Sequence, residues 1–292
     1  MVVPVVVVHW DEPERCQATV AALLGQTVPV RVLVVDNAST PERLAALRTG
    51  LSERNGSVEV VELRRNTGFG PAANVGFRRW LEDDQSDWIG LVPHDVDPDD
   101  DCLERMLAAA AVRPRAGLMS ADVGDGASPV VDRYFGGILR PAAVEEGWEP
   151  VDHPHGTLLL AHRRCLDDVG LFDERYFAYC EEADLGCRAR RAGWEVGLVR
   201  GAHVRNLHLS GPAPALDYLQ ERNTLLLVRQ QFGRYAATIR LACSALSLIG
   251  GVVRPRRRPA LFSVRARTTA IAHHLRGRYG PPPESLLGGS ER

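Results

Sequence analysis

Three carboxylates within four residues are the strongest chemical signal in this chain. Glu181, Glu182 and Asp184 follow an aromatic-rich run and precede an Arg-rich helical pattern, within residues 170–194. Carboxylates this close repel one another, so we expect at least one to hold its proton more tightly than a free acid. Such a carboxylate can act as a general base toward a hydroxyl nucleophile. The alternative is a helix start, with Asp184 as cap and both glutamates favoured by the positive end of the helix dipole.

The first part of the chain alternates strand and helix patterns. Apolar runs at residues 2–8, 31–35, 58–63 and 88–92 predict strands, and residues 14–24, 41–48 and 72–81 have helical spacing. Thr40 and Pro41 are typical of a helix cap and a first helical turn. This order predicts an α/β fold, with an open, mostly parallel twisted sheet and helices on both faces.

A polar cluster follows each of these four predicted strands. The clusters are His9 with Asp11, Asp36 with Asn37, Asn66 with Gly68, and Asp95 with Asp97. Turn chemistry would explain any one of them. Ligands of open α/β sheets bind at the carboxyl ends of the strands, so four clusters at four such ends favour a binding site there.

The composition fits a soluble globular protein in a reducing compartment. The 292 residues are 45% hydrophobic and 25% charged, and the six cysteines form no CxxC pair or other metal-ligand spacing, which argues against a disulfide framework. The apolar start, residues 1–8, is short and lacks a basic flank, so it reads as a strand and not as a signal peptide or membrane span. We therefore expect a cytoplasmic protein.

The near-neutral net charge of −2 conceals an acidic body and a basic C-terminal region. Residues 233–292 carry 11 Arg and two Glu, a net of +9, so the first 232 residues carry 24 Arg against 35 acids, a net of −11. An apolar helix is predicted at 236–253, and clustered Arg residues follow it at 254–258. Two interpretations stay open: the helix lies on an anionic membrane surface, or it packs on the body beside a solvated basic tail. The apolar run after Arg240 is too short to span a bilayer, and no aromatic residues interleave with the Arg cluster as nucleic-acid stacking would require.

Four blocks in order resemble the inverting family 2 glycosyltransferases of GT-A fold, in the rhamnosyltransferase-like and galactofuranosyltransferase-like branch. They are residues 5–10, residues 32–40 with Val-Val-Asp-Asn-Ala-Ser, residues 66–76 opening Asn-Thr-Gly-Phe-Gly, and residues 170–194. The resemblance covers about residues 3–232. It implies a glycosyltransferase domain at 1–232, with a nucleotide-sugar-binding half at 1–120 and an acceptor and catalytic half at 121–232. Residues 233–292, the apolar helix and Arg-rich tail, lie outside it.

The resemblance also implies how the donor is bound. Asp36 matches the acid that holds the nucleotide base and ribose, and Asn66 and Gly68 match a loop beside the donor. Asn74 would fix that loop or touch the donor, and Arg222 would neutralise the leaving diphosphate or pair with the acidic body. The complete set of expected donor-binding residues is His9, Asp11, Asp36, Asn37, Asn66, Gly68, Asn74 and Arg222.

A divalent metal, Mg²⁺ or Mn²⁺, is the expected cofactor. Asp95 matches the last acid of the family's DxD-like motif, but Pro93 and His94 replace the two preceding positions. Either Asp97 compensates, or one carboxylate suffices with the diphosphate and waters, or the acids at 97–101 are a helix start. For the family's late metal-binding His we favour His208 over His203 and Asn206, because Leu-Ser-Gly follows it.

Glu182 matches the family's catalytic base, and Glu181 and Asp184 would shape the acceptor site. The implied reaction moves a sugar from dTDP-rhamnose or a UDP-hexose to a hydroxyl of a glycan, glycolipid or natural product. It would take place in the cytoplasm, either in solution or at the inner membrane face. The alternative, prompted by Pro93 and His94, is a degenerate, non-catalytic nucleotide-sugar binder or partner subunit. A nucleotidyltransferase is disfavoured because no Gly-rich phosphate loop follows Val8.

Overall fold

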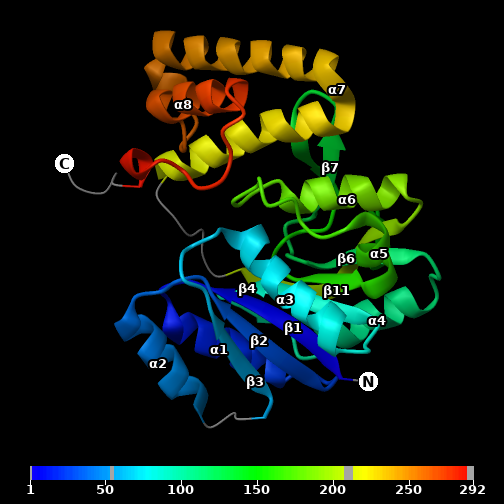
Figure 1. Ribbon diagram of the computed structural model, residues 1–292. Coiled ribbons are helices and arrows are strands. Elements are labelled where there is room, and N and C mark those ends of the chain that lie inside the picture. Colours follow the sequence, from blue (N-terminus) through cyan, green and yellow to red (C-terminus); the bar gives the residue numbers. More distant parts are fainter. Residues whose placement is uncertain (1, 53–55, 207–212, 288–292) are drawn as a thin grey trace.

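The computed structural model describes residues 2–52, 56–206 and 213–287 (Figure 1). The first part alternates strictly. Its elements are β1 (Val3–His9), α1 (Pro13–Leu24), β2 (Val30–Asp36), α2 (Pro41–Leu51), β3 (Val58–Glu62), α3 (Phe69–Asp83) and β4 (Trp88–Pro93). Thr40 caps α2 by accepting a hydrogen bond from the Arg43 amide at 3.4 Å, and Pro41 opens the helix, as the sequence predicts.

The second part is more mixed. Its elements are β5 (Val96–Pro98), α4 (Cys102–Ala111), β6 (Ala116–Asp122), β7 (Ala127–Asp132), β8 (Gly136–Pro141), β9 (Gly147–Pro150), β10 (Leu159–His162), α5 (Arg163–Val169), α6 (Glu181–Arg191), β11 (Glu195–Asn206), α7 (Ala213–Val253) and α8 (Val264–Leu275), with short 3-10 turns at Pro255–Arg257 and Glu284–Leu286. The sequence patterns missed β6 and α8. The helix start considered at 97–101 is found at Asp101, which precedes α4, whereas Asp97 belongs to strand β5 and pairs with Arg205 of β11.

The central sheet has the strand order β3-β2-β1-β4-β10-β6-β11-β5, with β9 paired to β11. The first four strands are parallel neighbours, as is the β6–β11 pair, whereas β10 runs antiparallel between β4 and β6. The parallel first half was predicted from the βα alternation. The antiparallel β10 and the separate β7–β8 hairpin were not.

Helices cover both faces of this sheet because its buried strands are apolar on both sides. Val5 and Val7 of β1 join a core cluster with side chains of α1, α2 and α4. Val6 and Val8 point to the opposite face and join a cluster with α3, α5 and α6. Period-two alternation of the side chains along one strand therefore serves two cores.

The C-terminal helices α7 and α8 stack at one end of the molecule, next to α6, whereas α2 lies at the other end (Figure 1). Gly233, with φ 82° and ψ −175°, interrupts α7, and the second half of the helix turns back over the first. Tyr218 and Leu219 of α7 form a cluster with Ala266 and Ala270 of α8. Helix α8 and Leu286 are therefore packed onto the first half of α7, whereas the Arg-rich segment 254–260 is exposed.

Candidate active site

The polar residues after β1, β2 and β4 lie side by side because the three strands are parallel and in register. His9 is directly opposite Asp36 in the β1–β2 pair, and Val8 is opposite Pro93 in the β1–β4 pair. The turn after β4 therefore places His94 and Asp95 next to His9. These registers therefore bring the residues at the strand ends together at one edge of the sheet, as the sequence predicts.

Asp36 is a fully buried carboxylate with three hydrogen bonds. It accepts from His9 Nδ1 at 2.8 Å, from the Ser39 hydroxyl at 2.5 Å and from the Ser39 amide at 3.1 Å. Burial raises its pKa, but these hydrogen bonds and the nearby imidazole outweigh burial, so the pKa lies below its usual value. Asp36 is thus held ionised in a fixed orientation at the base of the site.

The turn after β4 carries two buried groups suited to a cation. Asp95 is 4% exposed, and the charged groups near its carboxylate are His94, Glu12 and Arg15. Burial raises the pKa of Asp95. The His94 ring lies 5.5 Å from the His9 ring, and its buried Nε2 has no hydrogen bond partner but lies 3.6 Å from Glu12 Oε2.

These groups fit a divalent metal bound mainly by one protein carboxylate. The described residues contain no cluster of three or more His, Cys, Asp or Glu side chains placed to hold a metal. Asp97, the second candidate, has its carboxylate paired with Arg205 at 2.8 and 3.2 Å. His208 lies outside the described residues. Mg²⁺ often keeps water and phosphate ligands beside one or two carboxylates, so Asp95 alone is compatible with such a site.

A web of amide contacts joins the β2 loop to the loop before α3. The Asn37 amide donates to Asn66 Oδ1 and to the Gly68 carbonyl, both at 3.1 Å, and Asn37 Oδ1 accepts from the Thr67 amide at 2.8 Å. Asp11 is tied to the same region because its Oδ1 accepts from the Thr40 amide at 2.8 Å. In this structure Asn37 and Asn66 therefore fix the two loops against each other.

Glycines bring the loop before α3 against the segment that carries the carboxylates. A Cβ on Gly68, which has φ 96°, would lie 2.0 Å from the Phe177 carbonyl oxygen, and the Phe69 amide donates to that oxygen at 2.7 Å. Gly70 lies in contact with the Glu181 side chain. The backbone at Gly68 thus approaches residue 177 so closely that only glycine fits there.

Asn74 links α3 to the same segment. Its amide donates to the Phe172 carbonyl at 2.9 Å and to Glu174 Oε1 at 3.2 Å, and its Oδ1 accepts from the Phe172 amide at 3.1 Å. Asn74 is 1% exposed. It therefore fixes the 172–174 segment, and not the loop at residue 66 as expected.

Glu181 and Glu182 open α6 in different surroundings. Glu181 is 2% exposed and its Oε2 has no partner within the described residues, and burial followed by the charge of Glu182 raises its pKa well above 4.5. Glu182 is half-buried, and burial raises its pKa to about 7. The sequence predicted a raised pKa here, although burial contributes more than carboxylate repulsion.

Both glutamates and Asp95 lie near Tyr179. The pKa of Tyr179 is raised to about 12 by burial and then by the charges of Glu181, Glu182 and Asp95. Electrostatic influence falls off with distance, so all three carboxylates lie near one phenol. The catalytic candidates and the metal candidate are therefore close to the same side chain.

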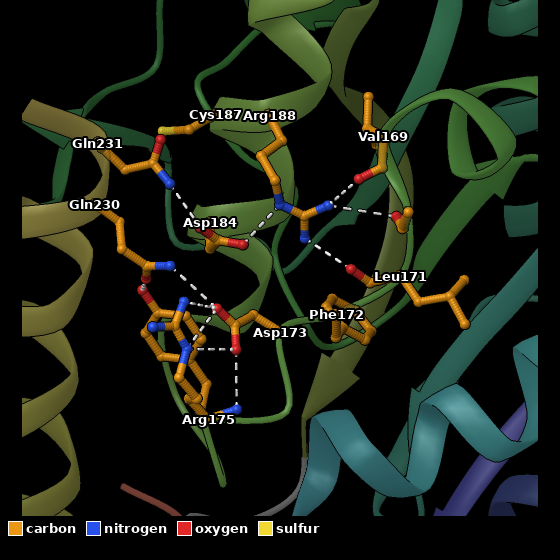
Figure 2. A network of polar contacts seen from close by, with 12 residues as sticks. Val169, Leu171, Phe172, Asp173, Arg175, Asp184, Cys187, Arg188, Gln230 and Gln231 are labelled. Atoms are coloured by element: carbon orange, nitrogen blue, oxygen red, sulfur yellow. Dashed lines mark hydrogen bonds and ion pairs between the residues drawn. The ribbon is translucent and has the colours of Figure 1, made fainter. Parts of the chain in front are cut away.

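The Asp184 carboxylate of α6 makes its contacts with other side chains of the protein (Figure 2). Its Oδ2 accepts from Arg188 Nε at 2.8 Å and its Oδ1 accepts from Gln231 Nε2 at 2.6 Å, while Arg188 also donates to the carbonyls of Val169 and Leu171. Asp184 lies in the first turn of α6, and Cys180 occupies the cap position predicted for Asp184. Both carboxylate oxygens are engaged within the protein, and they join α6, α7 and the 169–171 loop.

A second network in Figure 2 ties the preceding loop to α7. Gln230 Nε2 donates to Asp173 Oδ2 at 3.1 Å, and Gln230 Oε1 accepts from the Tyr176 hydroxyl at 2.6 Å. Arg175 donates to Asp173 at 2.6 Å. The segment leading to Glu181 is thus held by α7 at several points.

Arg222 is completely buried in α7 and does not pair with an acid of the described residues. Its Nη1 donates to the Tyr218 hydroxyl at 2.9 Å and its Nε donates to Asn223 Oδ1 at 3.0 Å, leaving Nη2 without a partner. Burial lowers its pKa. This arrangement excludes the expected alternative of pairing with the acidic body, as far as the described residues extend.

Left-handed backbone conformations also mark this region. Among the described residues, the non-glycine residues with positive φ are Asp11, Ala38, Tyr179 and Cys180. All four lie on loops that carry candidate site residues. Strained backbone of this kind persists where surrounding contacts over-determine it, often at functional sites.

Sequence reasoning missed two residues of the site, Glu12 and Gly156. Glu12 approaches His94, and Gly156 lies against Glu182, so that a Cβ there would be 2.0 Å from Glu182 Oε1. The resemblance does place Asn223, with Tyr218 and Arg222, on a helix that closes over the site, and in the structure Asn223 holds the carbonyls before Glu181. No local pattern reveals Gly156, because its contact with Glu182 spans distant parts of the chain.

The fold and the site define a GT-A glycosyltransferase. Residues 5–157 match the family model described as Glycosyl transferase family 2, and the chain belongs to this family. It is 30% identical, over 73% of its own length and 79% of the relative's, to an N-acetylglucosaminyl-diphospho-decaprenol L-rhamnosyltransferase from Mycobacterium tuberculosis. The predicted family, fold and enzyme class are confirmed.

Solved structures support the fold. The mannosyltransferase PcManGT from Pyrobaculum calidifontis, in complex with GDP-Man and Mn²⁺, has a TM-score of 0.60 at 15% identity, covering 94% of this chain and 86% of that one. GalNAc-T7 with UDP, GalNAc and Mn²⁺ has a TM-score of 0.64 at 13% identity, covering 97% of this chain and 59% of that one. At these identities the likeness concerns the fold alone.

Proposed function

We propose that this enzyme transfers a sugar, with inversion, from a nucleotide diphosphate sugar to a hydroxyl of a lipid-linked glycan, with Glu182 as general base. The observation that carries the proposal is the half-buried Glu182 carboxyl with a pKa of about 7. A base whose pKa lies near the working pH combines a substantial ionised fraction with a strong pull on the acceptor proton. Burial against Gly70 raises the pKa of Glu181 well above its usual value, and Glu182 is the more exposed of the two carboxyls, so Glu182 is the better placed for this role.

Donor binding falls to the strand ends. Asp36 would accept hydrogen bonds from the nucleotide base and ribose, within the loops that Asn37 and Asn66 hold together. Asp95 would hold a divalent metal, which supplies charge to offset the departing nucleotide diphosphate. On α7, Arg222 carries a positive charge that would act on the same diphosphate, and its Nη2 has no partner within the described residues. Its burial, however, favours a supporting role. The name of the mycobacterial relative suggests rhamnose as the transferred sugar and a polyprenyl diphosphate-linked sugar as acceptor, which agrees with dTDP-rhamnose among the donors expected from the sequence.

The decisive test is Glu182→Gln with Glu181→Gln as its matched control. Rhamnosyl transfer from dTDP-rhamnose to a short-chain polyprenyl diphosphate GlcNAc would be followed by mass spectrometry, with the anomeric configuration read by NMR. We expect Glu182→Gln to bind donor normally and to lose transfer by about 10²- to 10⁴-fold. Near-normal transfer by Glu182→Gln would refute the base assignment, and donor binding without transfer by the wild type would favour the non-catalytic alternative.

A lipid-linked acceptor would require an approach to the membrane, and the second half of α7 offers a surface for it. Exposed apolar side chains at Leu246, Ile249, Val252 and Val253 precede the exposed residues Arg254–Arg258. Within the part of the chain described, α7 is the one helix long and apolar enough to cross a membrane, with a mean hydropathy of 1.7 in a window 11% buried. The sequence analysis considered only the apolar run after Arg240, which is too short to span a bilayer by itself.

The packing of α7 favours a helix lying on the membrane and not crossing it. Ser244 is buried and bonded to Glu221, and Arg240 contacts the same glutamate at 3.3 Å. A spanning helix would have to break these contacts. Clustered Arg residues near an anionic surface each contribute about 1 kcal/mol to binding.

Vesicle co-sedimentation tests this surface. We expect binding to vesicles with 30% anionic lipid, on the order of physiological charge, but not to neutral ones, and a loss of binding in the variant Arg256→Ser, Arg257→Ser, Arg258→Ser. The double variant Arg43→Ser, Arg48→Ser on α2 removes exposed charge at the other end of the molecule and should bind normally. Equal loss in both variants would show a non-specific charge effect.

A further inference from the structure

The two residues immediately before Glu181 have left-handed backbone conformations. Tyr179 has φ 71° and Cys180 has φ 73°, and neither is glycine. This conformation brings Cβ close to a carbonyl oxygen and is unfavourable for L-residues. Two successive residues of this kind persist only where other contacts hold them. They also set the direction in which α6, and with it Glu182, leaves the turn.

One buried side chain on α7 makes those contacts. The Asn223 amide nitrogen donates to the Ala178 carbonyl at 2.8 Å and to the Tyr179 carbonyl at 3.0 Å. Asn223 Oδ1 accepts from Arg222 Nε at 3.0 Å, so the amide can only point its nitrogen toward the turn. Asn223 is completely buried, which makes these hydrogen bonds costly to lose.

The C-terminal helices support this contact from behind. Arg222 Nη1 donates to the Tyr218 hydroxyl at 2.9 Å, and that hydroxyl lies 2.8 Å from Nδ1 of His273 in α8. Phe177, Ala178 and Tyr179 pack against an apolar cluster formed by α7, α8 and Leu286. A polar chain and an apolar cluster therefore connect α8 to the strained turn.

We propose that Asn223, oriented by Arg222 and supported by α8, is a positioning residue that holds the turn at Tyr179 and Cys180 so that Glu182 faces the acceptor. The proposal rests on the proposed function, in which Glu182 is the base. It gives the C-terminal helices a part in catalysis beyond any membrane contact. Asn223 itself touches neither Glu182 nor, on this account, the substrate.

The experiment combines loss of the contact with relief of the strain. Asn223→Ala should lower kcat by about 10- to 100-fold, because a small misplacement of a catalytic group has effects of that size, and should leave the donor KM unchanged. Asn223→Asp, which can pair with Arg222 but cannot donate to the carbonyls, should show the same loss in a folded protein. Because glycine adopts positive φ without cost, Cys180→Gly should retain activity and should restore most of the kcat of Asn223→Ala.

Glu221→Gln is the matched control on the same helix. Its carboxylate faces Arg240 and Ser244 in the second half of α7, so the variant should lose stability and keep kcat. Normal kcat in both Asn223 variants, or a double variant no better than Asn223→Ala, would overturn the proposal. So would an equal loss of kcat in Glu221→Gln.

A second readout separates this proposal from the assignment of the base. Hydrogen exchange of the amides at 181–185, and the rate of thiol labelling at the half-buried Cys180, should both rise in Asn223→Ala. Cys180→Gly should restore the slow exchange. If Glu182→Gln retains transfer while these changes occur, the assignment of Glu182 as base fails, but the role of Asn223 in holding the turn stands. Unchanged exchange and labelling in Asn223→Ala would refute that role of Asn223, whichever residue is the base.

Discussion

Replacing Glu182 with Gln should stabilise the protein at alkaline pH while abolishing transfer. The pKa of Glu182 is raised from 4.5 to about 7 by burial, so the folded state penalises its ionised form. At 1.36 kcal/mol for each unit of pKa, this penalty is about 3 kcal/mol. A neutral amide of the same size escapes it.

The pH window follows from the two pKa values. Below pH 4.5 the carboxyl is protonated in both the folded and unfolded states and costs nothing. As pH rises from 4.5 to 7, the unfolded state releases the proton first, so the free energy of unfolding of the wild type falls. Above pH 7 the full cost is present. The advantage of Glu182→Gln should therefore be near zero at pH 4.5 and complete at pH 8.

The size of the effect on melting can be worked out from chain length. An unfolding entropy of about 2.1 cal/mol/K for each of the 292 residues gives about 0.6 kcal/mol/K. A gain of about 3 kcal/mol then raises Tm by about 5 °C at pH 8. Differential scanning calorimetry at pH 5 and pH 8 would measure it.

Glu174→Gln provides a control of opposite sign. Although burial raises the pKa of Glu174, its hydrogen bonds with Arg78 and Asn74 lower it below its usual value overall. Glu174 therefore contributes stability when ionised, and its loss should lower Tm at pH 8. A Glu182→Gln variant with a Tm at pH 8 equal to or below that of the wild type would refute the reasoning that burial tunes this carboxyl.

Three further outcomes are expected. The kcat of the wild type should rise about tenfold between pH 6 and pH 8, as a base of pKa about 7 ionises, and a flat profile would count against Glu182. Gly156→Ala should lower kcat about 100-fold, because the alanine Cβ would lie 2.0 Å from Glu182 Oε1 and displace the carboxylate. Donor affinity measured by calorimetry should not change. An unchanged kcat would show that Gly156 does not confine the Glu182 carboxylate. Asp95→Asn should abolish Mn²⁺-dependent nucleotide binding. Asp97→Asn should keep it, because the Asp97 carboxylate is already paired with Arg205. Equal losses of binding in the two variants would show that both carboxylates bind the metal.

The donor side of the site could be predicted because its geometry is local. A strand that ends in Asp36-Asn37 places those side chains at the sheet edge whatever the rest of the chain does, and parallel register then brings His9 opposite Asp36. The βα alternation alone is enough to infer this arrangement. The contacts among Asn37, Asn66 and Gly68 follow from the same two loops.

The acceptor side could be predicted only in part, because long-range packing sets its geometry. The sequence identified Glu181 and Glu182 by type and spacing, but assigned Asp184 to the acceptor site. In the structure its two oxygens are taken by Arg188 and by Gln231, a residue 47 positions away. A carboxylate next to two candidate acids carries no local mark that distinguishes a structural role from a chemical one.

The same distinction explains why the sequence left two interpretations open for the C-terminal region. Its apolar and basic composition suggested a surface helix with a tail, and the exposed residues from Leu246 onward agree with that. The first half of α7 and α8, however, hold the segment at 176–180, through the hydrogen bonds of Asn223 to the Ala178 and Tyr179 carbonyls and through the apolar cluster that α7 and α8 form. The second half of α7 folds back over the first at Gly233 and contacts Glu221 through Arg240 and Ser244, so the part that supports the base is packed against the part that offers the membrane surface. Lipid binding that rigidifies α7 would therefore also stabilise the catalytic turn, so activity should depend on the membrane beyond any gain in access to a lipid-linked acceptor.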